Sequence, residues 1–172
     1  MKDYCEQSDA VLIDLIHKGD SNAFEALYDR YSSKVLKQCY LFCLNTDQAN
    51  DLMHDVWIKI FFNIKSFKKE ASLSTWIYRI TTNHCLNHMK KKSEISLDEL
   101  EMEIPYSNGK EIGAEVKRIL SRLTLEDRAL LVMKYMDELT YEEISLRLDS
   151  GVSAIKMRLS RLIKEIRKEI VI

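Results

Sequence analysis

Apolar residues recur every three or four positions along most of this chain, the spacing of helices that each bury one face. In the amino-terminal half the pattern predicts four helices that pack as a compact bundle. Gly19 favours a helix end, and Asp20 and Asn45 are suited to cap the helices that follow them. The helices are expected at Asp9–Lys18, Asp20–Leu44, Asp47–Ile64 and from Ser72 or Ser74 to about Lys90.

The carboxy-terminal half carries clearer start and stop signals. Thr140 and Glu143 have the spacing of a reciprocal capping box, and Asp149-Ser150-Gly151 supplies a tight turn after that short helix. Two helices joined by such a turn, the second one basic, form a helix-turn-helix signature. The helices are expected near Ala114–Arg122, from Thr124 to about Met136, from Thr140 to Leu148, and along the apolar stripe Val152, Ile155, Leu159, Leu162 and Ile166.

Few residues interrupt these helices, because the chain has only four glycines and one proline, and strand signals are nearly absent. Three of those five residues, Pro105, Gly109 and Gly113, lie within 91–112 or directly after it. In this segment polar and acidic residues take the place of the regularly spaced apolar residues. The sequence therefore predicts an all-α protein of two small helical bundles, 1–90 and 113–172, joined by a flexible acidic linker at 91–112. The second bundle contains the helix-turn-helix.

Charge is distributed unevenly along a chain whose formal net charge is -1. That balance excludes a globally basic, histone-like binder and a disordered acidic tail. The formal charge is 0 over 1–90, -3 over 91–112 and +2 over 113–172, whereas residues 152–168 alone carry +5. Apolar runs such as Ala129–Met133 are far too short to cross a membrane, and the first residues do not resemble a secretory signal. We therefore expect a cytoplasmic protein without membrane insertion.

Two segments have the chemistry of nucleic-acid contacts. The basic final helix fits a major groove, where Lys156 and Arg161 are suited to guanine edges and Arg158 and Lys164 to phosphates; the alternative is a solvated basic face. Around residues 67–92, aromatic rings are interleaved with amides and cations, a mixture that suits a single strand, although Trp76 taken singly is more typical of a core position. The polar loop 68–72 is a candidate wall of a base pocket.

Other chemistry is weakly supported. Asp51, His54 and Asp55 lie on one helix as a candidate docking face for a protein, although the helix dipole alone would favour acids there. No catalytic motif is present, so we expect neither an enzyme nor a cofactor. Four cysteines without a CxxC pair indicate reduced, apolar thiols. The open alternatives are a metal site at His84, Cys85 and His88, with or without His54, or a metal or thiol sensor that uses Cys39, Cys43, Cys85 and His88.

Four motifs, in order along nearly the whole chain, resemble the bacterial extracytoplasmic-function (ECF) sigma factors of the sigma-70 family. They are Gly19-Asp20-Ser21-Asn22-Ala23-Phe24-Glu25-Ala26-Leu27-Tyr28, Asn50-Asp51-Leu52-Met53-His54-Asp55-Val56-Trp57, Ser74-Thr75-Trp76-Ile77-Tyr78-Arg79-Ile80 with Asn83, and Thr140-Tyr141-Glu142-Glu143-Ile144 with Ile155-Lys156-Met157-Arg158-Leu159.

The resemblance implies a transcription initiation subunit that binds core RNA polymerase (beta and beta-prime subunits) and promoter DNA, with an anti-sigma factor as a further partner. It places the polymerase contact at Asp51, His54 and Asp55, and implies that the acidic linker mimics nascent RNA. The predicted single-strand contacts at the −10 element are Phe67, Lys69, Glu70, Ala71, Ser72, Trp76, Arg79, Asn83 and Asn87. The predicted duplex contacts at the −35 element are Lys156, Met157, Arg158, Ser160, Arg161 and Lys164.

The rival interpretation is a self-sufficient helix-turn-helix repressor or activator whose residues 1–112 dimerise or sense a signal. It predicts a dimer that binds a palindromic site tightly without polymerase. A sigma factor with this charge balance is instead expected to bind DNA weakly when it is free, because it makes a small phosphate footprint.

Overall fold

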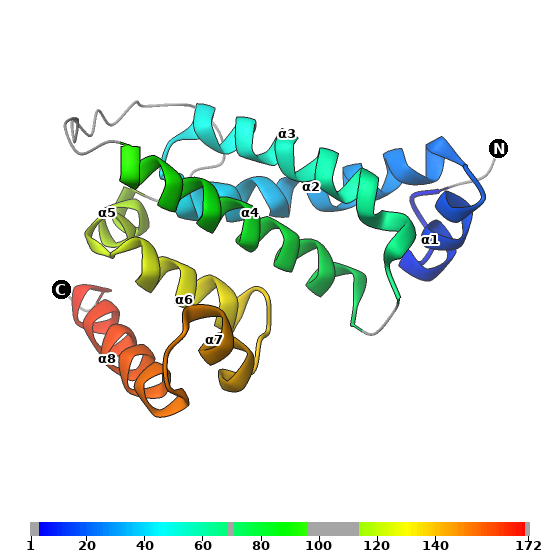
Figure 1. Cartoon of the computed structure of the whole chain (residues 1–172). Coiled ribbons are helices and arrows are strands. Elements are labelled where there is room, and N and C mark those ends of the chain that lie inside the picture. Colours follow the sequence, from blue (N-terminus) through cyan, green and yellow to red (C-terminus); the bar gives the residue numbers. More distant parts are fainter. Residues whose placement is uncertain (1–3, 69–70, 96–113, 171–172) are drawn as a thin grey trace.

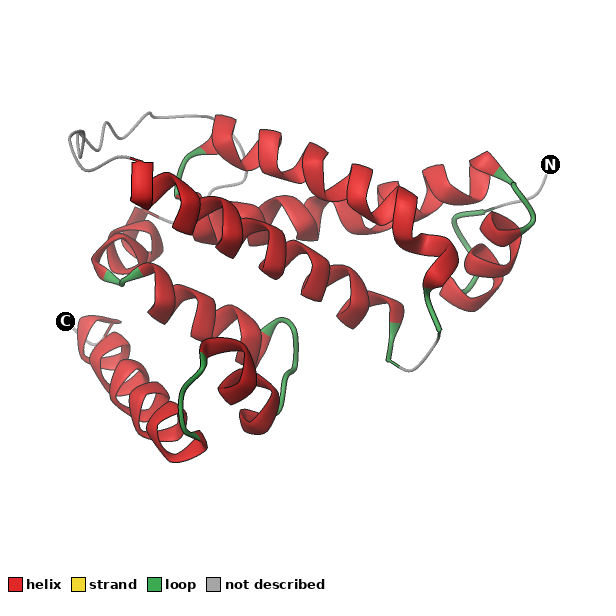
Figure 2. Cartoon of the chain, in the orientation of Figure 1, coloured by secondary structure: helices red, strands yellow, loops and turns green. Residues whose placement is uncertain are grey.

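The computed structural model describes residues 4–68, 71–95 and 114–170. Within those ranges every regular element is helical (Figure 2), which confirms the predicted all-α class. The elements are α1 (Asp9–His17), α2 (Ser21–Cys43), α3 (Thr46–Asn63), the 3-10 turn η1 (Ile64–Ser66), α4 (Leu73–Ile95), α5 (Ala114–Arg122), α6 (Leu125–Tyr135), α7 (Tyr141–Leu148) and α8 (Val152–Ile170).

Three long helices, α2, α3 and α4, pack side by side, and α1 crosses one end of them (Figure 1). Their predicted boundary signals are confirmed. Asp20 accepts hydrogen bonds from the amides of Asn22 and Ala23, and the Asn45 side chain accepts one from the amide of Gln48. Gly19 has a φ of 88°, the left-handed conformation that ends a helix at little steric cost.

The fourth helix differs from its prediction at its carboxyl end. Ser72 caps α4, since its Oγ accepts a hydrogen bond from the amide of Thr75 at 3.1 Å. The helix then continues to Ile95, beyond the expected end at Lys90. Lysines 90–92 lie where the helix dipole favours cations, so the polar sequence there extends the helix rather than ending it. The rest of the predicted linker, 96–112, lies outside the described residues.

Helices α5 to α8 contain the predicted helix-turn-helix. Thr140 and Glu143 form the complete capping box at the start of α7. In the turn that follows, Asp149 adopts the left-handed conformation, with a φ of 47°. The apolar stripe of α8 packs inward, with Ile155, Leu159 and Leu162 buried.

The two halves share one hydrophobic core, a feature that the sequence pattern did not predict. Helix α6 packs against both α2 and α4, and its Ala129, Leu130 and Met133 are completely buried. Figure 1 shows α6 lying alongside α4, with α7 and α8 beyond it. Within the described ranges, no helix is long and apolar enough to cross a lipid bilayer.

Candidate nucleic-acid interface

Helix α8 presents a polar face to solvent opposite its buried stripe. Lys156, Met157, Ser160, Arg161 and Lys164 are all exposed, and Met157 keeps 64% of its surface accessible. A helix of this length spans about 28 Å, which is enough to place its first turns in a major groove. Five of the six residues predicted for duplex contact are therefore available on one surface.

Arg158, the sixth residue, is engaged within the protein. Its Nε donates to Asp127 Oδ1 at 2.7 Å and its Nη1 donates to Glu126 Oε2 at 2.8 Å. These bonds to Glu126 and Asp127 raise the pKa of the Arg158 guanidinium above its usual range. Arg158 thus holds α8 against the amino-terminal end of α6, and its charge is already paired.

A polar groove of about 320 Å³ lies between α3 and α4. It brings together three of the predicted single-strand residues, Trp76, Asn83 and Asn87. Sequence reasoning missed the α3 side, where Lys59 and Asn63 are spaced one helical turn apart, as Asn83 and Asn87 are on α4. The full lining is Lys59, Asn63, Ser66, Trp76, Ile80, Asn83, His84 and Asn87.

His84 also lines this groove, and its surroundings favour the neutral imidazole. Its Nε2 is 3.5 Å from Asp55 Oδ2 without the geometry of a hydrogen bond. Burial and the nearby Lys59 charge lower the pKa of His84, which outweighs the opposing effect of Asp55. A neutral imidazole leaves Lys59 as the cation of the groove near neutral pH.

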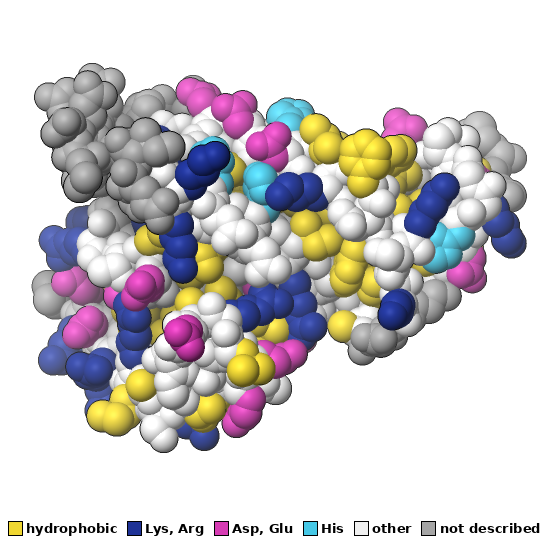
Figure 3. Space-filling view, in the orientation of Figure 1, with side chains coloured by type: hydrophobic (Ala, Val, Ile, Leu, Met, Phe, Trp, Pro, Cys, Tyr) yellow, Lys and Arg dark blue, Asp and Glu magenta, His cyan; other side chains and the backbone are white. Residues whose placement is uncertain are grey.

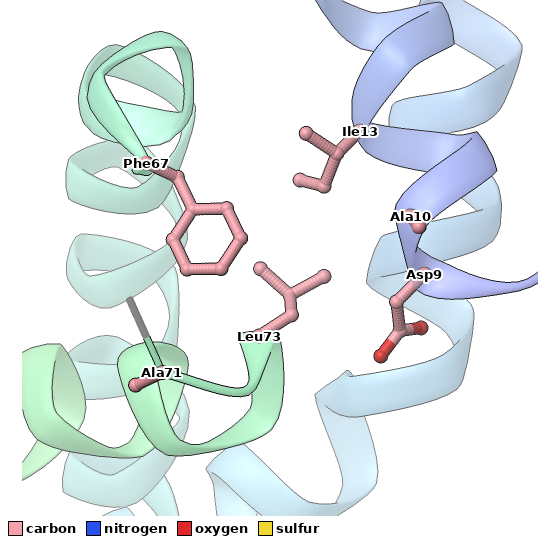
Figure 4. A pocket seen from close by; sticks show the side chains of 6 residues that line it. All are labelled: Asp9, Ala10, Ile13, Phe67, Ala71 and Leu73. Atoms are coloured by element: carbon pink, nitrogen blue, oxygen red, sulfur yellow. The ribbon is translucent and has the colours of Figure 1, made fainter. Parts of the chain in front are cut away.

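A second, apolar cavity of about 190 Å³ lies between α1 and the described residues just before and at the start of α4 (Figure 4). Phe67 points into it from the residue after η1, Leu73 from the start of α4, and Ile13 faces them from α1. Phe67 is buried and its ring centroid lies 5.4 Å from that of Trp76, so its ring packs between this cavity and Trp76. Ala71 also lines the cavity, whereas Lys69 and Glu70 lie outside the described residues.

Two of the predicted single-strand residues contact the carboxy-terminal half. Arg79 Nη2 donates to Glu143 Oε1 at 3.0 Å, and Arg147 Nη1 donates to Asn83 Oδ1 at 2.9 Å. Both partners lie on α7. The predicted DNA face of α4 is therefore in contact with the helix-turn-helix in this structure.

The outer face of α3 combines charge and apolar surface. Asp51, His54 and Asp55 are exposed at its amino-terminal half, as the docking prediction requires. Farther along the same face, Ile58 and Phe62 keep 55% and 76% of their surfaces exposed. Figure 3 shows the resulting hydrophobic patch over the later turns of α3. Sequence analysis missed this patch, because apolar residues at helical spacing resemble core positions.

Comparison with known families matches both halves of the chain. Residues 27–95 match the model of sigma-70 region 2, and residues 113–166 match that of sigma-70 region 4. The chain is an ECF sigma factor of the sigma-70 family. Accordingly it is a non-catalytic factor that directs transcription initiation, as expected from the absence of catalytic motifs.

Relatives of this sigma factor match it over most of its length. The ECF RNA polymerase sigma factor SigW of Bacillus subtilis is 29% identical over 90% of this chain and 92% of its own. The ECF RNA polymerase sigma-E factor of Escherichia coli K12 is also 29% identical, over 90% of each chain.

Solved structures share its fold. The sigma factor RpoE in complex with the anti-sigma factor NepR, from Bartonella quintana, aligns with a TM-score of 0.63 and 19% identity over 87% of this chain and 97% of its own. CnrH in complex with the cytosolic domain of CnrY aligns with the same TM-score at 17% identity, over 95% of this chain and 97% of its own.

The cysteines of this sigma factor lie mainly in its core. Cys85 Sγ donates to Cys39 Sγ at 3.6 Å, and both residues are buried. The hydrogen bond to Cys39 and burial raise the pKa of the Cys85 thiol far above its usual range, so it stays protonated. No group of three or more metal-ligating side chains is placed to hold an ion within the described part of the chain.

Proposed function

We propose that this sigma factor uses three separate surfaces in initiation. The outer face of α3 docks on core RNA polymerase, the groove between α3 and α4 takes the single-stranded −10 element, and α8 reads the −35 duplex. The observation that carries the proposal is the groove, because it gathers three asparagines, a lysine and a tryptophan at one site. We place the protein in the cytoplasm, where promoter DNA is found.

The groove has the three properties that a single-strand site needs. Trp76 offers an aromatic surface on which a base can stack. Asn63, Asn83 and Asn87 carry amides that both donate and accept, as the Watson–Crick edge of an unpaired base requires. Lys59 adds the cation that a phosphate needs. Together they support capture of an unstacked base during promoter melting.

The face of α3 suits a protein partner with both basic and apolar groups. Asp51 and Asp55 supply negative charge at one end, and Phe62 supplies exposed aromatic surface at the other. Aromatic anchors contribute much of the affinity of protein interfaces, while rim charges guide the encounter. We propose that this face docks on core polymerase, with Asp51, His54 and Asp55 in contact.

Both DNA sites bind promoter DNA tightly enough for initiation only when the protein is bound to polymerase. The basic helix carries +5, but the chain as a whole carries -1, so either DNA contact is weak alone. Two weak contacts held on one scaffold gain by effective concentration. Apolar surface left open on the free protein is also a binding site for an anti-sigma factor, which we propose as a further partner.

Transcription from fragmented genomic DNA by matching core polymerase, with and without this protein, tests the function directly. New start sites that share two spaced upstream elements are the expected result. Absence of new starts, together with tight binding to a palindrome without polymerase, would favour the repressor or activator instead.

Replacing Asn83 by alanine is expected to slow promoter melting about tenfold while polymerase affinity stays within about twofold, because one base-edge contact is lost. Permanganate reactivity of the −10 thymines measures melting, and fluorescence anisotropy measures polymerase binding. Asn22→Ala, an exposed asparagine on α2 away from the groove, serves as the matched control. An equal loss of melting and polymerase binding would contradict the groove assignment.

Arg161→Ala is expected to cost about 1–3 kcal/mol of binding to the −35 element, since an exposed arginine on α8 is suited to a guanine edge. Holoenzyme affinity for promoters that differ only at the −35 positions measures the loss. Arg167→Ala, on the last turns of the same helix, should weaken binding to all sequences equally. Unchanged −35 preference in Arg161→Ala would remove this residue from the reading surface.

A further inference from the structure

Tyr141, the first residue of α7, lies beside two lysines from neighbouring helices. The Nζ of Lys134 on α6 is 4.4 Å from the centroid of the Tyr141 ring, and the Nζ of Lys156 on α8 is 5.2 Å from it. Both distances are within the range of a cation–π interaction. Helices α6, α7 and α8 pack against one another (Figure 1), so a single aromatic ring meets cations from both neighbours of α7.

We propose that Tyr141 is a positioning residue for promoter recognition: its ring holds the Lys156 ammonium at the exposed face of α8 and thereby sets how strongly one base pair of the −35 element is preferred. Tyr141 acts through Lys156 and needs no base contact of its own. This inference rests on the proposed function of α8 in reading the −35 duplex.

The ring of Tyr141 has a fixed place within region 4. Thr140 and Glu143 form the capping box that sets where α7 begins, and Tyr141 lies between them in the sequence. Its side chain is half-buried and packs against the hydrophobic core. A ring with these constraints has few alternative positions, so the fold places any cation that lies over it.

The two lysines differ in how firmly they are held. Lys134 is half-buried, and its Nζ also donates to the carbonyl of Leu139 at 3.3 Å. Lys156 is exposed and forms no ion pair within the described ranges. Two cations near one ring repel each other, so the fixed Lys134 weakens the attraction of Lys156 to the ring. The Lys156 ammonium is therefore ordered but still able to turn toward DNA.

The backbone of α8 is also fixed near Lys156. Arg158, two residues along the helix, is bound by two carboxylates of α6 at 2.7 and 2.8 Å. The residues on either side of Met157 thus contact different neighbouring helices, which limits rotation of α8 about its axis. The contact of Lys156 with Tyr141 follows from this packing.

Positioning matters more for a lysine than for an arginine. A lysine ammonium is a point charge on a flexible four-carbon stem, whereas an arginine presents a rigid fork of donors. A mobile ammonium binds base edges and phosphate oxygens alike, and phosphates carry no sequence information. Held over a ring, Lys156 reaches a limited set of atoms and loses less conformational entropy when DNA binds. Discrimination between base pairs therefore depends on the ring.

The test measures base preference rather than affinity alone. Holoenzymes that contain wild type, Tyr141→Leu, Tyr141→Phe or Lys156→Met are selected on promoters with randomised −35 positions, and the enriched sequences are counted. Leucine removes the ring but keeps an apolar contact with the core, whereas phenylalanine keeps the ring and removes only the hydroxyl. Tyr135→Leu, at a tyrosine of α6 that is 59% exposed, is the matched control.

A second measurement detects the contact in the unaltered side chains. Lysine ammonium groups labelled by reductive ¹³C-methylation give one NMR signal each, and Lys156→Met assigns the signal of Lys156. A ring-current shift of that signal in wild type and in Tyr141→Phe is the expected result. A signal at the ordinary lysine position in wild type would overturn the inference whether or not Tyr141→Leu folds.

We expect Tyr141→Leu to reduce the preference at one −35 position about two- to fivefold, the factor that a cation–π contact at an exposed site supplies. Lys156→Met should lose preference at the same position, while Tyr141→Phe and Tyr135→Leu should stay close to wild type. An equal loss in Tyr141→Phe, or a loss of affinity in Tyr141→Leu that is the same for all sequences, would overturn the inference.

The same selection separates this inference from the proposed function of α8. Lost preference in Lys156→Met with full preference in Tyr141→Leu would overturn the positioning role of Tyr141 and leave the function of α8 intact. A wild-type holoenzyme without any −35 preference would contradict the function of α8 itself, and the inference with it.

Discussion

Replacing Asp137 by asparagine is expected to raise the free energy of unfolding at pH 8 by about 2–4 kcal/mol and to change it little at pH 4. Asp137 is completely buried, and this burial raises its pKa to about 7. The folded state therefore binds a proton that the unfolded chain releases near pH 4. Asparagine keeps the shape and the acceptor for Gln38 but carries no charge to bury.

The sign of the pH dependence follows from that raised pKa. The stabilising contribution of protonated Asp137 is complete below about pH 4 and is lost as pH rises through about 7. Thr82, Gln38 and the charges of Arg147 and Arg79 oppose the shift, but less strongly than burial promotes it. Cys85 is a further titratable neighbour, and its thiol stays protonated over this range.

Urea unfolding of wild type and Asp137→Asn from pH 4 to pH 8 measures the effect. The difference between the two proteins should grow with pH and flatten as pH passes about 7. Other titrating groups cancel in this difference because both proteins share them. A difference that stays constant with pH would show that Asp137 is ionised in the folded state throughout the range.

The second large effect concerns two phenylalanines at contrasting positions. Phe42 lies on α2 and is completely buried in the hydrophobic core of the protein. Phe42→Ala is therefore expected to lower the free energy of unfolding by about 3–5 kcal/mol, through lost contacts and the cavity left behind. Phe62 is 76% exposed on α3, so Phe62→Ala should change stability by less than about 0.5 kcal/mol. Denaturant unfolding monitored by circular dichroism measures both.

Binding to core polymerase is the second measurement on Phe62→Ala. If the face of α3 docks on core polymerase, Phe62→Ala should weaken binding about tenfold while the fold is intact, because exposed aromatic side chains are frequent anchors. Lys65→Ala, an exposed change just beyond α3 on η1, is the control. Full polymerase affinity in Phe62→Ala would exclude the apolar patch from the docking face.

Helix boundaries were predictable from sequence because their causes are local. Asp20, Asn45 and Thr140 each cap a helix through amides two or three residues away, so the signal and the structure lie in one short window. The exposed face of α8 was predictable for the same reason, since the spacing of its apolar residues determines which side chains point away from the buried stripe. The end of α4 was predicted too early, near Lys90, because the lysines that follow are typical of a linker. In the structure they continue the helix to Ile95.

Contacts between distant segments could not be predicted in this way. Gln38 and Asp137 are 99 residues apart, and nothing near either residue shows that the two side chains meet. Similarly, the groove needs Asn63 from α3 beside Asn83 from α4, which depends on how two helices pack. The apolar patch at Phe62 was missed because hydrophobic spacing does not distinguish a core position from an exposed docking surface.

Glu143 divides its two carboxylate oxygens between separate tasks. Oε1 accepts from Arg79 of region 2, whereas Oε2 accepts from the amide of Thr140 and completes the cap of α7. Arg158 on α8 forms ion pairs with Glu126 and Asp127 on α6, and all three residues belong to region 4. Both sets of bonds lie within region 4, so the cap of α7 and the attachment of α8 do not depend on contacts with region 2.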